Sequence, residues 1–102
     1  MSDIRKARKT LTSRVLEGDA EVSPCERRAA FDNSGLTEPL STLVDKVARH
    51  AYTVTDEDIS AAKESGLSDD QIFEIVVCAA IGAATRQYDT ALAALEVATE
   101  WE

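Results

Sequence analysis

Apolar residues recur at steps of three and four along most of this chain, which is the spacing of one face of an α-helix. Residues 3–17 have this pattern, and Gly18 directly after them is a typical stop signal. The same spacing continues from Pro39 to Val54, so we expect one helix there with a single apolar face. The positions in this second stripe are Leu40, Leu43, Val44, Val47, Ala51 and Val54. Helical periodicity therefore predicts an all-α fold.

Polar residues mark the starts of three further helices. Ser23 to Glu26 combine an N-cap serine, a proline at the first helical position and a glutamate at the capping-box position. The Asn-Ser-Gly sequence at residues 33–35 predicts the end of this short helix. Thr55 precedes three acidic residues, which the positive end of a helix dipole favours. Ser68 and Gln71 form a second capping-box pattern, which predicts the start of the last helix.

The last predicted helix spans residues 69–98 and contains the uncharged run IVVCAAIGAAT at positions 75–85. Its first half is apolar all round, a pattern that predicts burial on every side. Alanines and Gly82 would let neighbouring backbones approach closely, so we expect a leucine at position 82 to overpack a helix contact. Because a chain of 102 residues has only a modest core, we expect this helix to be shared with a subunit interface in a homo-oligomer.

The overall charge disfavours a nucleic-acid partner, since 19 acidic residues against 11 basic ones give a net charge of −8. A membrane partner is disfavoured as well, because the eleven-residue run at 75–85 is shorter than the roughly 20 apolar residues that span a bilayer. The charged N-terminal residues 1–18 lack the apolar segment of a signal peptide. We therefore expect a cytoplasmic protein with reduced cysteines.

The charge is unevenly distributed along the chain. Residues 1–18 contain five basic and two acidic residues, a net charge of +3, which leaves −11 for the remainder of the −8 total. We interpret residues 1–18 as a basic amphipathic helix that precedes a single helical domain at residues 19–102. The basic helix could dock on an acidic subunit or protein partner, or it could be a solvated arm.

The segment AKESGLSDDQIFEIVVCAAIGAATRQYDTALAALEVATE, residues 62–100, resembles the C-terminal part of the carboxymuconolactone decarboxylase and alkylhydroperoxidase D (AhpD) superfamily. KARKTLTSRVLEGDAEVSP at residues 6–24 is similar to the leading helix of the decarboxylase branch. The resemblance implies an AhpD-like domain of about five helices, with a long Ala-rich C-terminal helix, that forms oligomers. It also implies one of two activities, thiol-dependent peroxide reduction or decarboxylation of a lactone.

The catalytic motif of that superfamily is absent from this chain. The peroxidase branch has a CxxC pair followed by a histidine about eight residues before the glycine that corresponds to Gly66. Counting back without gaps places Asp58 at the histidine position, and Ala51 and Val54 at the cysteine positions. A gapped alignment would instead leave the catalytic segment out altogether. Either alignment removes the catalytic pair and leaves a degenerate site.

Three single residues remain candidates for chemistry. Cys78 lies inside the uncharged run, where burial would make its thiol inert, so we favour a packing role for it. Cys25 follows Pro24 at a helix N-terminus, so it is the better candidate for a reactive thiol, although a surface cysteine without function is the simpler interpretation. His50 flanks the apolar stripe without a second chemical group beside it, which favours a histidine at the edge of the core.

Arg86, Tyr88 and Asp89 form the most unusual local group of polar residues, since Arg86 directly follows the apolar run. Arg86 and Asp89 are three residues apart, so they could form an internal ion pair or line a small polar cavity. We favour the structural ion pair, because a partly buried arginine needs a partner whatever the function.

The sequence favours a non-catalytic, AhpD-like oligomeric protein that acts as a structural, partner-binding or small-ligand-binding subunit. The alternative is a decarboxylase-like or thiol peroxidase-like enzyme that uses displaced residues. In that alternative His50 would be the base and Arg86 an anion clamp, with Tyr88 and Asp89 beside them and Cys25 or Cys78 for redox chemistry. We expect no cofactor and no bound metal, because neither cysteine has a second cysteine at metal-binding spacing.

Overall fold

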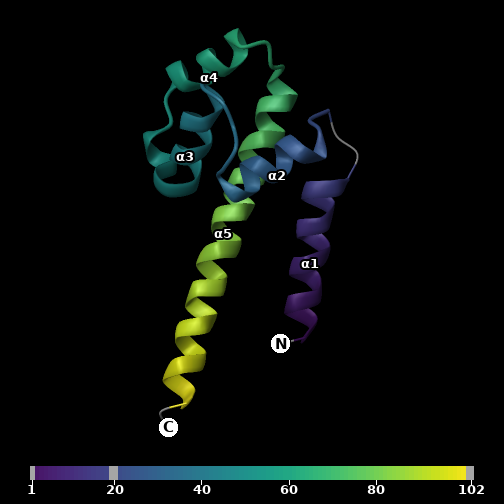
Figure 1. The fold of residues 1–102 in the computed structure, drawn as a ribbon, viewed down its shortest axis with the longest axis vertical. Coiled ribbons are helices and arrows are strands. Elements are labelled where there is room, and N and C mark those ends of the chain that lie inside the picture. Colours follow the sequence, from purple (N-terminus) through teal and green to yellow (C-terminus); the bar gives the residue numbers. More distant parts are fainter. Residues whose placement is uncertain (1, 19–20, 101–102) are drawn as a thin grey trace.

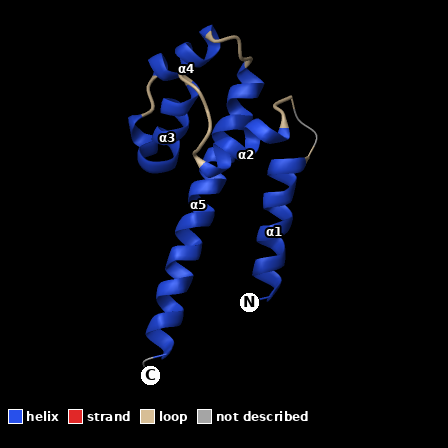
Figure 2. Cartoon of the chain, in the orientation of Figure 1, coloured by secondary structure: helices blue, strands red, loops and turns tan. Residues whose placement is uncertain are grey.

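The computed structural model describes the backbone of residues 2–18 and 21–100 and the side chains of residues 6–18 and 21–99. These residues form five α-helices and one short 3-10 turn, so the all-α prediction is confirmed for them (Figure 2). The elements are α1 (Ser2–Glu17), α2 (Pro24–Asp32), α3 (Leu40–His50), η1 (Ala51–Thr53), α4 (Asp56–Glu64) and α5 (Asp69–Glu100). The predicted long C-terminal helix is α5.

Helix α5 runs along the whole molecule, and α2, α3 and α4 gather around its first half (Figure 1). Helix α2 crosses it, α3 and α4 pack on one side, and α1 descends beside it with its N-terminus toward the C-terminal end of α5. The molecule measures 55 × 29 × 20 Å, with a radius of gyration of 15.5 Å. A compact domain of this length has a radius of gyration of about 13 Å. The second half of α5 therefore extends beyond the body.

The predicted helix starts are confirmed by their hydrogen bonds. The Ser23 hydroxyl accepts from the Glu26 backbone N–H at the start of α2. A full capping box opens α4, where Thr55 and Asp58 each accept from the other's backbone N–H. The Gln71 backbone N–H donates to the Ser68 hydroxyl at 3.1 Å, while the Ser68 backbone N–H donates to Gln71 Oε1 at 2.9 Å. These caps satisfy helix N–H groups that have no partner inside the helix.

The prediction of one helix from Pro39 to Val54 is wrong at its C-terminal end. Helix α3 stops at His50, the 3-10 turn η1 follows, and Val54 has extended backbone angles. The Thr53 hydroxyl donates to the His50 carbonyl at 2.7 Å, which replaces a helical hydrogen bond at this point. The prediction failed because the apolar spacing continues as far as Val54. This residue still packs against the core, although its backbone is extended and not helical.

Two apolar clusters form the core, and α5 contributes to both. The larger cluster contains Val22, Ala30, Val44, Ile75, Cys78 and Ala79. The smaller cluster contains Leu43, Ala62 and Ile72 and joins α3, α4 and α5. Every side chain in the two clusters is at most 5% exposed. Helix α5 is therefore the central helix of the domain, as the sequence predicted.

Gly82 lies where α5 crosses α2, and the two backbones are in direct contact there. A Cβ atom added to Gly82 would lie 1.9 Å from the Phe31 carbonyl oxygen and 2.7 Å from its carbonyl carbon. No side chain fits at such a distance, so glycine is required at this position. The close approach that the small residues predict is thus a crossing of two helices within one chain.

The expected burial of α5 on every side is not what a single chain provides. Ile75, Cys78 and Ala79 are buried, whereas Phe73, Ala80 and Ala84 on the same stretch of helix are exposed. The reason is that α2 and α3 cover one side of α5, and the chain has too few other elements to cover the opposite side. None of the helices among the described residues combines the length and the hydrophobicity that a membrane-spanning segment needs.

Candidate functional site

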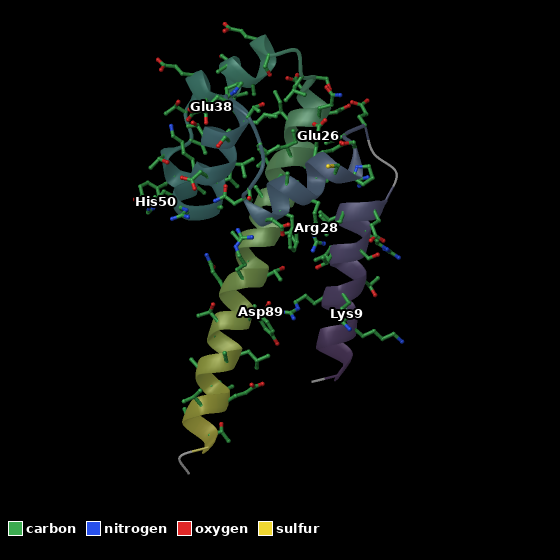
Figure 3. The ribbon with its side chains drawn as sticks, in the orientation of Figure 1. Lys9, Glu26, Arg28, Glu38, His50 and Asp89 are labelled. Atoms are coloured by element: carbon green, nitrogen blue, oxygen red, sulfur yellow. The ribbon has the colours of Figure 1, made fainter. Side chains whose placement is uncertain are left out.

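The candidate residues from the sequence lie at separate places in the structure. His50 is exposed at the end of α3, where its ring meets the edge of the Tyr52 ring with the centroids 5.9 Å apart. Cys25 is exposed in the first turn of α2, and Cys78 is buried in α5. Figure 3 shows His50 on α3 well separated from Asp89 on α5. The six candidates therefore do not form one constellation.

Arg86 forms a hydrogen bond that joins α5 to α2. Its Nη1 donates to the Phe31 carbonyl oxygen at 2.5 Å, next to the crossing at Gly82. This oxygen lies in the last turn of α2, where a cation is favoured by the helix dipole. A polar cavity of about 400 Å³ adjoins Arg86. Its lining consists of Asp32, Asn33, Ala48, Arg49, Ala83, Arg86 and Gln87. Helix α3 contributes Ala48 and Arg49 to this wall, and His50 is not part of it.

The expected ion pair between Arg86 and Asp89 is not formed. Asp89 Oδ1 instead accepts from Nη1 of Arg8 in α1 at 2.8 Å. The Arg8 guanidinium also lies 4.5 Å from the centroid of the Tyr88 ring, in cation–π geometry. The pairing differs from the prediction because α1 descends beside α5 and brings a second arginine to Asp89, which no local spacing reveals. Tyr88 and Asp89 therefore attach the basic helix α1 to α5.

The residues at the family's catalytic positions also have structural surroundings. Asp58, at the histidine position, closes the capping box of α4 and accepts from Lys46 Nζ at 2.8 Å. The hydrogen bond from Lys46, with those from Thr55, holds the pKa of the Asp58 carboxyl below its usual range. Ala51 is exposed in η1, and Val54 packs against the smaller core cluster. A carboxylate with a lowered pKa is a weaker base than the imidazole that the resemblance would place at this position.

A site that the sequence analysis missed lies at the junction of α1, α2 and α5. Arg27 is only 4% exposed there, although it is charged. Its Nη1 donates to the Val15 carbonyl oxygen at 3.1 Å, in the last turn of α1. Its Nε is buried without a hydrogen-bond partner in the part of the chain that the structure describes. The sequence does contain an indication of this burial. Ala30 and Phe31 follow Arg27 by three and four residues, which places all three on the buried face of α2.

A cavity of about 200 Å³, which we call the junction cavity, lies beside Arg27. It is lined by Arg14, Val15, Arg27, Phe73, Glu74, Val77 and Cys78. Both carboxylate oxygens of Glu74 accept backbone hydrogen bonds, from Glu21 N at 3.1 Å and from Val22 N at 2.9 Å. Glu74 thereby connects α5 to the segment that precedes α2.

The Cys78 thiol forms part of the wall of the junction cavity and lies 3.8 Å from the Val15 carbonyl oxygen. Burial raises the pKa of the Cys78 thiol, and the nearby Arg27 charge opposes this only in part. A raised pKa leaves little thiolate near neutral pH, and the thiolate is the reactive form. The structure therefore supports the interpretation of Cys78 as a packing residue.

We expect a thiol reagent to modify Cys25 in the native protein at least about tenfold faster than Cys78, because Cys25 is exposed and Cys78 is buried with a raised pKa. The Cys25→Ser and Cys78→Ser variants isolate the two rates, and denatured protein gives the intrinsic rates for comparison. The Cys78 rate should rise as the pH approaches the raised pKa. Equal native rates for the two thiols would contradict this arrangement.

In the described residues, no group of three or more histidine, cysteine or acidic side chains could hold a metal ion. Comparisons of the chain with family models, with curated proteins and with solved structures find no match. The resemblance to the AhpD superfamily therefore stays a prediction from the sequence. The contacts of the structure itself are the basis for the function proposed below.

Proposed function

We propose that this protein is a non-catalytic helical subunit that pairs with a second copy of itself through the exposed face of α5. The observation on which the proposal rests is a row of exposed apolar residues along that helix. Its members are Phe73, Ala80, Ala84, Ala91 and Leu95, which we call the outer stripe. They are separated by steps of seven and four residues, so they lie on one side of the helix.

The two large apolar side chains of the outer stripe are mostly exposed to solvent in the single chain. Phe73 is 68% exposed and Leu95 is 60% exposed. Between them only alanines occur in the stripe, and small side chains let two helices pack at a short distance. Steps of seven and four residues are those of a seam between paired helices. Burying this side would remove apolar surface from water, which is the main driving force for association.

A second copy fits the outer stripe because Ala84 divides the stripe into two halves of equal length. Ala84 lies midway between Phe73 and Leu95, eleven residues from each, so an antiparallel pair places Phe73 of one copy near Leu95 of the other. The Phe73 end is next to Arg14, since both line the junction cavity. The Leu95 end is next to Glu96. In an antiparallel two-fold pair Arg14 of one copy would lie toward Glu96 of the other, while Glu74, in the same cavity wall as Arg14, is held by hydrogen bonds from the backbone of residues 21 and 22.

The dispersed candidate residues and the missing catalytic motif also favour a structural role. The six candidate residues for catalysis are dispersed, and two of them hold α1 against α5. Proteins of the AhpD superfamily that the sequence resembles form oligomers. The absence of their CxxC and histidine residues favours a subunit without their chemistry, and the expected cytoplasmic location is compatible with its free cysteines.

We expect Leu95→Glu to weaken self-association by about tenfold or more, because it places a carboxylate in an apolar contact. The matched control is Val97→Glu, since Val97 is 55% exposed on another side of the same helix. Both variants add one negative charge to the same turn of α5. Sedimentation equilibrium over a range of concentrations measures the two dissociation constants. If both variants weaken association equally, general charge repulsion is responsible and the outer stripe is not the interface.

A further inference from the structure

Arg27 is the only charged residue in the described part of the chain that is almost completely buried. Removing a guanidinium from water is unfavourable unless an opposite charge or a full set of hydrogen bonds replaces the water. Among the described residues, no ion pair includes Arg27, and its Nε has no hydrogen-bond partner. The Val15 carbonyl at the end of α1 supplies only the partial negative charge of a helix C-terminus. The positive charge of Arg27 is therefore only partly compensated.

The junction cavity places a second guanidinium close to the first. Arg14 from α1 and Arg27 from α2 both belong to its wall. Glu74 is the acidic residue of that wall, and its two oxygens already accept hydrogen bonds from the backbone of residues 21 and 22. Two positive charges against one negative charge make this cavity locally positive, although the whole chain has a net charge of −8.

The rest of the wall is apolar. Val15, Phe73 and Val77 surround the space beside the two arginines. The cavity volume of about 200 Å³ is below the roughly 300–1,000 Å³ of sites for drug-sized ligands. A ligand that suits this wall is small, has one negative charge at one end and is apolar at the other.

We propose that the junction cavity binds a small monocarboxylate with a short apolar tail. The carboxylate lies between the guanidinium groups of Arg14 and Arg27, which match the planar geometry of a carboxylate. The tail packs against Phe73 and Val77. The bound anion completes the charge balance of Arg27 and adds a contact between α1 and the body of the protein. The site shares Phe73 and Arg14 with one end of the proposed interface, so binding and pairing are measured by separate readouts.

Sodium butyrate is a suitable probe, with sodium chloride at the same ionic strength and neutral butyramide as comparisons. The Nε–H resonance of Arg27 in a ¹H–¹⁵N spectrum reports directly on the buried guanidinium. We expect butyrate to shift this resonance in a saturable way and to slow the modification of Cys78, which shares the wall. Chloride and butyramide should cause neither change.

The Arg14→Gln variant tests the second guanidinium without disturbing the bond from Arg27 to Val15. We expect it to weaken butyrate binding by about tenfold, which is the loss of one charge-assisted hydrogen bond. The matched control is Lys9→Gln, which removes the same charge from an exposed position on α1 (Figure 3). Circular dichroism checks that both variants keep the wild-type helix content.

Three results would overturn the carboxylate site. The first is an Arg27 resonance that does not respond to butyrate. The second is an equal response to butyramide, which would mean that the charge is irrelevant. The third is an equal loss of affinity in Arg14→Gln and Lys9→Gln, which would indicate only a general effect of charge. Because the resonance of Arg27 is read separately from the molecular mass, failure of this site and failure of the proposed pairing are distinguishable.

Discussion

Gly82→Ala is expected to destabilise the protein by about 2–3 kcal/mol, although alanine is normally the better helix former by about 1 kcal/mol. The added methyl group would lie 1.9 Å from the Phe31 carbonyl oxygen and 2.9 Å from Phe31 Cα, so α2 and α5 must move apart. That displacement would also weaken the hydrogen bond from Arg86 to the same carbonyl oxygen. Urea unfolding followed by circular dichroism measures the change in free energy.

A matched comparison for this prediction is Ala93→Gly, at an exposed position of the same helix outside the outer stripe. It should destabilise the protein by up to about 1 kcal/mol through helix propensity alone. Exchange of alanine and glycine in either direction is thus expected to be unfavourable, for two different reasons. If Gly82→Ala were more stable than the wild type, α5 and α2 could not be in the close contact described above.

Ala84→Glu is expected to abolish self-association, because Ala84 lies at the midpoint of the outer stripe. In an antiparallel two-fold pair the residue at the midpoint meets its own copy, so one substitution brings two carboxylates together in an apolar contact. The matched control is Ala93→Glu. Ala93 is an exposed alanine nine residues further along α5, which places it on the opposite side of the helix. Ala93→Glu should leave association within about threefold of the wild type.

The symmetry of the pair gives this prediction a sharper form. Ala84→Lys alone should also prevent pairing, whereas a mixture of the Ala84→Glu and Ala84→Lys variants should form heterodimers through opposite charges. Native mass spectrometry distinguishes the mixed pair when one variant is isotopically labelled. Recovery of mixed pairs requires that Ala84 faces Ala84 across the interface. A mixture that remains monomeric would exclude an antiparallel interface centred on this residue.

The helix starts could be predicted because capping is a local property of the sequence. Ser23, Thr55 and Ser68 each bond to the backbone three residues further on, so a few adjacent letters contain the information. The end of α3 at His50 was missed for the opposite reason. Val54 keeps its contact with the core after the chain leaves the helix, and so the apolar spacing continues through the break.

The polar contacts between helices could not be read from the sequence. Arg86 and Asp89 are suitably spaced for an ion pair, yet each finds a partner on a different helix. Burial of Arg27 was missed because an arginine next to Arg28 looks like part of a solvated surface. The packing of α1 and α5 against α2 encloses it, and that packing depends on residues far apart in the chain.

The self-pairing of α5 is tested most directly by the mass of the wild-type protein in solution. Sedimentation equilibrium at micromolar concentration should give twice the chain mass of 11.0 kDa, with dissociation on dilution. The same measurement on Ala84→Glu should give the chain mass alone. A wild-type mass of 11.0 kDa at every concentration up to the solubility limit would contradict the account, because the outer stripe would then be exposed without a partner.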